Sequence, residues 1–345
     1  MNTMRDREQY DAVVLVTPDS FKRLAGQYKY YLKYMPVRCV HILGSSVVGE
    51  LFDECKGRIT EGYDPDRMDF INEDDILPFD DVHEEIRAEM AELLAGRELP
   101  RGITGWYYQQ FLKLSYACRC QDEYYLIWDG DTFPCCNFSM FSNPQDGSSP
   151  RPYLDIKQEY HAEYFETMGR LIPGMEKVIG PSFISEHMLF NKGLVLELIG
   201  AIEANDRIPG DIFWRKIIHG VEGARLQDSS FSEYETYGTY VAINHSSAYR
   251  LREWHSFRLG AEFFDPDTIC ERDYEWLGHD FTAISFEKGQ EVRFDHQNLF
   301  DNPEYQSKLT AAQMLQVVQE EFEEGYKESW GDSTDTNVTS GEFNA

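Results

Sequence analysis

The chain has 345 residues, of which 42% are hydrophobic and 14% aromatic, and its 61 Asp and Glu against 32 Lys and Arg give a formal net charge of −29. The length allows one large domain or two of ordinary size, and the aromatic content excludes a chain that is disordered throughout. The acid excess argues against nucleic acid or anionic lipid as a partner, because both are bound through clustered Lys and Arg.

The first part of the chain predicts a parallel α/β fold. The apolar run 11–18 is typical of a strand buried on both faces, the spacing of 21–34 predicts a helix, and 37–44 repeats the strand pattern. These three segments form a β-α-β unit with the usual right-handed crossover. A weaker strand at 68–72 and an amphipathic helix at 82–95 follow.

Strands and helices continue to alternate along the rest of the chain. A helix at 105–117, with Thr104 as its expected N-cap, precedes an apolar strand at 123–128 that leads directly into Asp129-Gly-Asp131. The other expected elements are strands at 182–190 and 239–244 and helices at 192–204, at 211–219 and from 307 onward. The composition of 143–150 indicates a loop.

We expect one mixed α/β domain over 8–305, with a mostly parallel sheet flanked by helices. An amphipathic helix over 306–328 and an acidic, flexible tail over 329–345 complete the expected organisation. Seven cysteines, odd in number and unevenly spaced, predict reduced thiols and a cytoplasmic protein. We expect no signal peptide, because residues 1–9 contain no apolar h-region, and no transmembrane segment, because no run approaches about 18 apolar residues.

Asp129 and Asp131 follow the apolar strand with one residue between them. Two short carboxylates so placed can hold one divalent ion that keeps positions open for substrate phosphates, and open α/β sheets bind ligands at this end of their strands. Mn²⁺ or Mg²⁺ would also neutralise a nucleoside diphosphate as it leaves. The alternative is a plain Asp-Gly turn, since such a pair occurs by chance in many chains.

Three motifs together carry a resemblance to a known group of enzymes. They are Gly105-Trp-Tyr-Tyr-Gln-Gln-Phe-Leu-Lys-Leu114, the Asp129-Gly-Asp131 strand end and Ser232-Glu-Tyr-Glu-Thr-Tyr-Gly238. Over residues 10–300 the chain resembles glycosyltransferases of the GT-A fold, and in particular a bacterial family of largely uncharacterised GT-A-like proteins. The resemblance implies a GT-A-like (Rossmann-like) domain that uses Mn²⁺ or Mg²⁺ and a nucleotide-sugar donor, with a UDP-sugar as the first choice. It also implies a saccharide or glycolipid acceptor in surface polysaccharide synthesis.

The resemblance further assigns residues to the donor site. Asp129 and Asp131 match the motif for metal and diphosphate, with Asp131 as the more direct ligand. Gln110 and Lys113 match the helix motif, where the lysine could reach a phosphate or a sugar hydroxyl. Thr17, at the end of the first strand, lies where GT-A enzymes hold the nucleoside. The alternatives are a solvated helix face for Lys113 and a plain strand-end residue for Thr17.

An acceptor hydroxyl needs a carboxylate base within hydrogen-bond reach in an inverting enzyme. Glu233 is our first candidate and Glu235 the second, because both precede an expected strand and stand among aromatic residues that could pack on a sugar. Asp211 and Glu186 are the next candidates, and Glu186 is also assigned to acceptor binding. Each of these acids could instead cap a helix or face solvent.

Histidine and tryptophan residues supply the remaining candidates. GT-A enzymes often add a His from a C-terminal segment as a further metal ligand, a role that fits His245 first and His296 second. His187 is assigned to the acceptor. A hydrogen-bonded structural histidine is the alternative for each. Three tryptophans could stack on a carbohydrate or simply pack in the core: Trp214, Trp254 and Trp276.

Two other functions remain open. Phosphatases of the haloacid-dehalogenase type also carry an Asp-x-Asp motif after an apolar strand. In those enzymes Thr or Val stands two residues after the second Asp, whereas here Thr132 follows Asp131 directly. A nucleotide-binding or scaffold protein could also retain the fold without catalysis.

Overall fold

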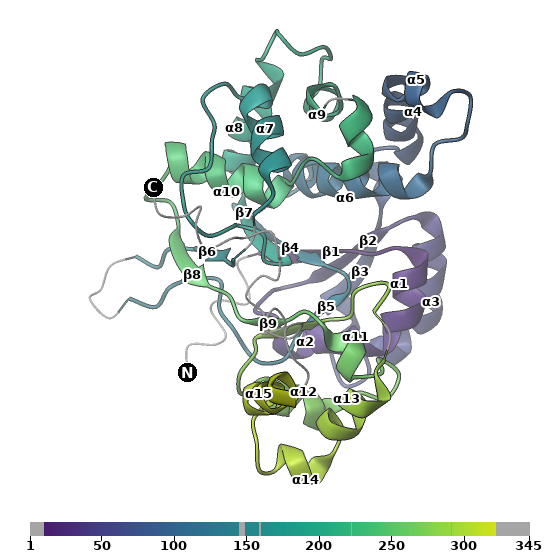
Figure 1. Cartoon of the computed structure of the whole chain (residues 1–345), viewed down its shortest axis with the longest axis vertical. Coiled ribbons are helices and arrows are strands. Elements are labelled where there is room, and N and C mark those ends of the chain that lie inside the picture. The colour runs from purple at the N-terminus through teal and green to yellow at the C-terminus, as the bar shows by residue number, and fades with distance from the viewer. Residues whose placement is uncertain (1–9, 145–148, 159, 222, 291, 322–345) are drawn as a thin grey trace.

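The computed structural model describes residues 10–144, 149–158, 160–221, 223–290 and 292–321. At its centre is a five-stranded sheet (Figure 1) with the spatial order β3 (Met68–Asn72), β2 (Val40–Gly44), β1 (Asp11–Leu15), β4 (Tyr124–Asp129) and β7 (His187–Asn191). The first four strands are parallel, and β7 runs antiparallel to β4. The predicted α/β fold with a mixed, mostly parallel sheet is therefore confirmed.

Helices cover both faces of this sheet, because successive side chains of its strands point to opposite sides. Ala12 and Val14 of β1 belong to one core cluster, whereas Val13 belongs to another. The helices over the first cluster are α1 (Pro18–Leu24), α2 (Lys29–Tyr34) and α3 (Ser46–Ile59). The helices over the second cluster are α4 (Phe79–Glu89), α5 (Ala91–Leu94), α6 (Arg101–Ser115), α7 (Ala162–Leu171), α8 (Lys192–Glu203), α9 (Phe213–Gly220) and α10 (Glu233–Asn244).

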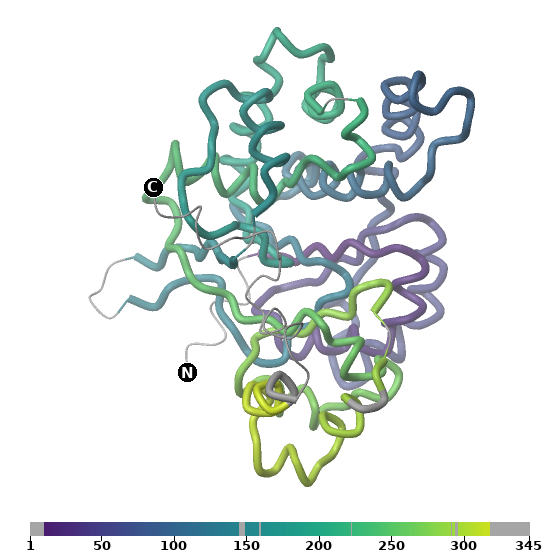
Figure 2. The backbone as a smooth tube through the Cα atoms, viewed as in Figure 1, coloured from purple at the N-terminus to yellow at the C-terminus, as the bar shows by residue number. Residues whose placement is uncertain are grey.

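The C-terminal part of the chain returns to the first face of the sheet (Figure 2). It passes through β8 (Arg250–Glu253), which pairs in parallel with β6 (Tyr153–Ile156). A small sheet then joins β5 (Thr132–Pro134), β10 (Ala283–Ser285) and β9 (Ser256–Phe257). The last helices are α11 (Gly260–Phe263), α12 (Glu271–Leu277), α13 (Phe294–Phe300), α14 (Pro303–Gln306) and α15 (Ala311–Glu321). Buried side chains from Trp254 to Leu315 join the core cluster under α1 to α3.

Helix bounds in the N-terminal half differ from the expected ones. The helix expected at 21–34 is divided into α1 and α2 by a 3-10 turn, Ala25–Gln27. Thr104 is not the N-cap of α6, because the helix begins about one turn earlier, at Arg101, with Pro100 in the N-cap position. The Thr104 hydroxyl instead lies 2.8 Å from His83 Nδ1. Neither α3 nor α7 is among the predicted elements.

The strand expected at 239–244 is wrong, because this segment is the second half of helix α10. The helix starts at a good cap, where the Ser232 hydroxyl accepts a hydrogen bond from Glu235 N at 3.2 Å. It continues through Thr239 and Val241 because tertiary packing overrides their preference for strands. A Cβ at Gly238 would stand 2.2 Å from the Phe183 ring, so glycine is what lets α10 approach this loop so closely.

Three further elements start later than expected. The strand predicted at 182–190 begins only at His187, because Glu186 has φ +59° and interrupts the extended backbone. Helix α9 begins at Phe213, so Asp211 precedes it. The helix expected from 307 begins at Ala311, and its buried residues pack into the core. The expected tail at 329–345 lies outside the described residues, and the domain boundaries stay predictions.

No helix within the described ranges combines the length and the apolar character that crossing a bilayer requires.

Gly130 makes the close approach on which the end of β4 depends. A Cβ on this residue would lie 2.2 Å from the Leu15 carbonyl oxygen and 2.4 Å from Val16 Cγ1. We expect Gly130→Ala to lower the free energy of unfolding by about 1–3 kcal/mol, because the β1 backbone must move. Gly57→Ala in α3, where a Cβ meets nothing within 4 Å, should be neutral or stabilising. Urea unfolding of both variants checks this, and equal midpoints would contradict it.

Candidate functional site

The candidate site lies at the edge where the parallel strands end. Asp129 is the last residue of β4, and its register partner on β1 is Leu15, two residues before Thr17. Asn72 ends β3 at the same edge. Ligands of open α/β sheets bind outside the carboxyl ends of the strands, so the fold places the Asp-x-Asp motif where binding is expected.

Lys113, in the last turn of α6, is the centre of the site. Its Nζ lies 2.8 Å from Asp129 Oδ1 and 2.6 Å from Glu233 Oε1, and only 4% of its side chain is exposed. The Nζ also stands 4.2 Å from the centre of the Tyr234 ring. Burial lowers the pKa of Lys113, but the two carboxylates outweigh burial, so its pKa is raised and the amine stays charged.

Glu233 connects this ammonium to helix α10, of which it is the first residue. Its backbone N donates to Gln110 Oε1 at 3.0 Å, so Gln110 and Lys113 on successive turns of α6 hold both ends of the same residue. Burial raises the pKa of Glu233, and Lys113 opposes that rise. The three motifs of the sequence, on α6, β4 and α10, therefore meet at one buried ion cluster.

Asp129 and Asp131 have different surroundings. Asp129 Oδ1 accepts from Lys113 and, at 3.2 Å, from the Tyr234 hydroxyl, while about a third of the side chain (32%) is exposed. Burial raises the pKa of Asp131 to about 7, and the charges of Asp129 and Glu287 add to the shift. Asp131 is half-buried beside two other carboxylates, so its negative charge is not fully compensated. A bound divalent cation would compensate it.

The residues present fit part of a metal shell. Two carboxylates at a strand end are hard oxygen ligands of the kind that Mg²⁺ and Mn²⁺ prefer, with substrate phosphates and water completing the shell. Within the described ranges no third His, Cys, Asp or Glu side chain joins Asp129 and Asp131 as closely as ligands of one ion. His245 instead bonds Glu197 Oε1 at 2.8 Å, and it lies about 18 Å from Glu233 along α10.

The two residues assigned to the acceptor form a second buried polar cluster next to the first. Glu186 accepts from Lys157 Nζ at 2.6 Å and from the Ser256 hydroxyl at 3.0 Å, and its carbonyl accepts from Asp129 N at 2.9 Å. His187 is fully buried, with Nε2 2.8 Å from Asp155 Oδ2. Glu186 thus adjoins Asp129 through the backbone, whereas the His187 imidazole bonds Asp155 and packs on Trp254.

The remaining candidate residues, Glu235, Asp211 and Thr17, have other partners than Lys113. Glu235 Oε2 accepts from the Ser182 hydroxyl at 2.6 Å and from Phe183 N at 3.0 Å, so it anchors the loop before β7. Asp211 is 81% exposed and pairs with Arg215. Thr17 caps α1, where its Oγ1 accepts from the Ser20 backbone N at 3.2 Å.

The remaining aromatic candidates are separated in the core. Trp214, on α9, packs near Phe111, whereas Trp254 packs on His187. Trp276 donates to the Leu309 carbonyl at 2.8 Å, and His296 is buried against the Phe263 ring. These residues do not converge on one face: Trp214 lies in the second core cluster, and Trp254 and Trp276 in the first.

Sequence reasoning did not identify several charged residues around the strand end. Arg258 Nη2 pairs with Glu287 Oε1 at 2.8 Å, and Arg258 Nε lies 3.5 Å from Glu186 Oε1. Arg23 lies near Asp131 and lowers its pKa in part. These residues stand in segments without a motif, so only the tertiary structure brings them to the site. Tyr234, by contrast, was inside the third motif and could have been named.

We expect the Lys113 cluster to be strongly coupled energetically. Lys113→Met should cost about 3–5 kcal/mol of unfolding free energy, because it leaves two facing carboxylates without a cation. In the Glu233→Gln background the same substitution should cost at least about 1 kcal/mol less. The matched control is Lys308→Met, which removes an exposed pair with Glu304 and should cost less than about 1 kcal/mol. Equal costs for the two lysines in urea unfolding would contradict the coupling.

Glu73, in the turn after β3, predicts a pH effect at the same edge. Burial and then Asp74 raise its pKa to about 7. The folded chain therefore holds this proton more tightly than the unfolded chain, and stability is lost as the pH rises from about 4.5 through about 7. Glu73→Gln should gain unfolding free energy relative to wild type between about pH 5 and about pH 8. Urea unfolding at several pH values measures the difference in unfolding free energy between this variant and wild type. The matched control is Asp75→Asn, which changes an exposed acid in the same turn, and an equal trend in the two variants would contradict the assignment.

Comparison with solved structures finds glycosyltransferases, the group that the three motifs resemble. The apo form of the glycosyltransferase GlyE of Streptococcus pneumoniae TIGR4 is 11% identical, with a TM-score of 0.36 and 91% of this chain covered. The chain spans 64% of GlyE, less than two thirds of its length. The apo form of mouse xyloside xylosyltransferase 1 is 11% identical, with a TM-score of 0.40, and 82% of this chain and 99% of that chain are covered. The galactosyltransferase LgtC, in complex with donor and acceptor sugar analogs, is 12% identical, with a TM-score of 0.36 and coverages of 87% and 96%.

No curated protein matches the chain. The profile of a family of unknown function, DUF6492, matches residues 47–291, which is more than half of the chain. The chain therefore belongs to this family.

Proposed function

We propose that the protein is a metal-dependent glycosyltransferase that moves a sugar from a nucleotide-sugar donor to a saccharide or glycolipid acceptor. The observation that supports this most is the meeting of three motifs at the carboxyl end of β4, where Lys113 bridges Asp129 and Glu233. A strand end of a parallel sheet with paired carboxylates suits a cation and a diphosphate. We infer a UDP-sugar donor, a cytoplasmic location and a role in surface polysaccharide synthesis from the resemblance of the motifs.

In this proposal Asp129 and Asp131 hold the cation. A bound Mn²⁺ or Mg²⁺ would neutralise the diphosphate leaving group. Asp129 Oδ1 is occupied by Lys113 and Tyr234, so its carboxylate is fixed in orientation, and Oδ2 has no hydrogen-bond partner among the described residues. Asp131 Oδ1 accepts a long contact of 3.5 Å from Thr132 Oγ1. Both aspartates therefore keep oxygen atoms for a ligand.

Lys113 and Glu233 act as positioning residues in this scheme. The ammonium of Lys113 already donates to two carboxylates and is almost fully buried, so it orients Asp129 rather than reaching a phosphate. The Glu233 carboxylate is paired with that ammonium and is 4% exposed. A carboxylate that must leave an ion pair to accept a proton is a poor general base. We therefore assign Glu233 to holding α10 against α6.

The phosphatase alternative gains no support from the geometry around Thr132. Its hydroxyl lies 2.7 Å from Ser285 Oγ in the small sheet, and the residue is 1% exposed. The hydroxyl is therefore engaged by a side chain of β10, and its contact with Asp131 is long, at 3.5 Å. A scaffold without catalysis stays the second alternative, and an assay of products separates the three functions.

The test is release of nucleoside diphosphate from a panel of UDP-sugars with Mn²⁺ and mixed saccharide acceptors. We expect release with wild type, and a fall of about 100-fold or more with Asp131→Asn, because several kcal/mol of charge stabilisation are lost. The matched control is Asp267→Asn, an exposed loop aspartate, which should keep full activity. Circular dichroism should show that both variants are folded.

Two results would contradict the proposal. Release of orthophosphate from simple phosphoesters without diphosphate release would favour the phosphatase. Mn²⁺-dependent binding of UDP without turnover of any donor in the panel would favour the scaffold.

A further inference from the structure

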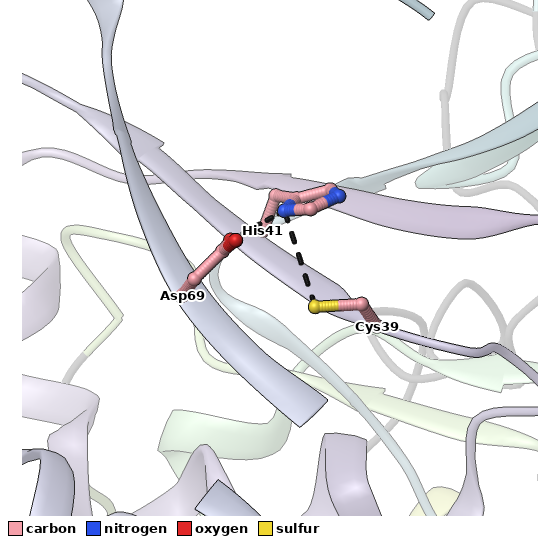
Figure 3. Close-up of side chains that lie close together, drawn as sticks. All are labelled: Cys39, His41 and Asp69. Carbon is pink, nitrogen blue, oxygen red and sulfur yellow. Dashed lines mark hydrogen bonds and ion pairs between the residues drawn. The ribbon is translucent and has the colours of Figure 1, made fainter. Parts of the chain in front are cut away.

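A group of potential metal ligands lies at the opposite edge of the central sheet, where the parallel strands begin. Cys39 directly precedes β2, His41 is on β2, and Asp69 is on β3 (Figure 3). One ligand atom from each residue lies within 4.8 Å of the others, and His41 Nδ1 contacts both Asp69 Oδ1 and, at 4.0 Å, Cys39 Sγ. Of the residues that the structure describes, this is the one group of three that meets this spacing.

The sheet itself brings these side chains together. Cys39, just before β2, and His41, on β2, are two residues apart, and the 4.0 Å contact between Sγ and Nδ1 places their side chains together. His41 and Asp69 are register partners on neighbouring parallel strands, so their side chains stand next to each other. Cys39 and His41 are partly buried and Asp69 is exposed, so the group is open to solvent on one side.

Asp11 on β1 orients two of the three ligands. Its Oδ1 accepts from Cys39 N at 3.1 Å, and its Oδ2 lies 3.3 Å from His41 Nε2. A carboxylate on one ring nitrogen of a histidine directs the other nitrogen, here Nδ1, toward a metal ion, and such pairs are common behind metal-binding histidines. Arg38 pairs with Asp11 at 2.6 Å and holds the carboxylate in place.

We propose that Cys39, His41 and Asp69 form a zinc site, with Asp11 as the residue that orients the imidazole. The thiolate, imidazole and carboxylate together are the ligand set of a borderline-soft ion and are unsuited to Mg²⁺. Zinc bonds of about 2.3 Å to sulfur and about 2.0–2.1 Å to nitrogen place the two atoms about 3.6 Å apart in a tetrahedron. The observed 4.0 Å between Cys39 Sγ and His41 Nδ1 is close to this spacing. His41 Nδ1 and Asp69 Oδ1, which are in hydrogen-bond contact, must move apart to about 3.3 Å to share the ion.

The site connects β2 to β3, which is the edge strand of the sheet. Three protein ligands leave a fourth tetrahedral position for water. A strand rises about 3.3 Å per residue, so Cys39, at the start of β2, lies more than about 15 Å from the end of the sheet that carries Asp129. The zinc site is therefore independent of the proposed transferase site, and either can fail without the other.

The competing state is an imidazolium of His41 held between Asp11 and Asp69. It needs no metal ion, because the ring proton supplies the positive charge between the carboxylates. The two states differ in the role of the cysteine, since only the metal-bound state requires the Cys39 thiolate. A spectroscopic signal from sulfur bound to a metal therefore separates them.

The experiment uses the full chain, stripped of metal and kept reduced, and titrated with Co²⁺ and then Zn²⁺. We expect thiolate-to-Co²⁺ charge-transfer absorption at one equivalent, its loss on adding Zn²⁺, and a rise in the thermal unfolding midpoint with Zn²⁺. Cys39→Ser should abolish the absorption, and Asp69→Asn should weaken Zn²⁺ binding at least tenfold. Asp11→Asn should weaken it by about 10–100-fold, as for other residues that orient a ligand.

The matched control is Cys118→Ser, which removes an exposed thiol outside the group and should leave the absorption unchanged. No charge-transfer absorption in wild type, or absorption that persists in Cys39→Ser, would overturn the proposal and support the imidazolium. Loss of the absorption in Cys118→Ser as well would also overturn it, because the thiolate ligand would then lie elsewhere. Circular dichroism confirms that each variant is folded before titration.

Discussion

The buried ammonium of Lys113 is the constraint on which the arrangement at the strand end depends. A charge with 4% of its side chain exposed is tolerated only if it is paired and hydrogen-bonded, and here the partners come from β4 and α10 while the lysine comes from α6. Removing the lysine would leave two facing carboxylates in the core without a cation. The cluster thus fixes Asp129 in orientation, and it fixes the first turn of α10 against the last turn of α6 at the same time.

The chain's excess of acidic residues is also present locally, around the end of β4. Most carboxylates around the strand end have a cation: Asp129 has Lys113, Glu186 has Lys157, and Glu287 has Arg258. Asp131 is the exception, since burial and then the charges of Asp129 and Glu287 raise its pKa, and the Arg23 charge offsets this rise only in part. A site that pairs three acids and leaves a fourth with too little positive charge is suited to an added cation. The net charge of the whole chain could suggest such a cation but could not say which acid would need it.

Strand positions and motif residues could be predicted from the sequence because their signals are local. Apolar runs mark β1, β2 and β4, and the motif containing Lys113 is continuous along one helix. The end of α10 could not be predicted, because Thr239 and Val241 favour strands and only packing keeps them helical. The pairing of Lys113 with Glu233, 120 residues apart, depends on how α6 and α10 cross and has no counterpart in the order of residues. Glu186, with φ +59°, delays the start of β7 to His187, although the apolar residues before it favour an earlier start.

A parallel sheet has two edges of different chemical use, and this chain places polar clusters at both. The first residues of parallel strands lie together at one end of the sheet, and the last residues lie together at the other end. Residues that are distant in sequence therefore become neighbours at both ends. At the ending edge the donors are the oxygens of Asp129 and Asp131, which prefer a hard cation and phosphate. At the starting edge they include the sulfur of Cys39 and the nitrogen of His41, which prefer a softer ion. The donor atoms alone would therefore direct different metal ions to the two proposed sites, because a magnesium ion gains little from a thiolate and a zinc ion is held more tightly by sulfur and nitrogen than by two carboxylates.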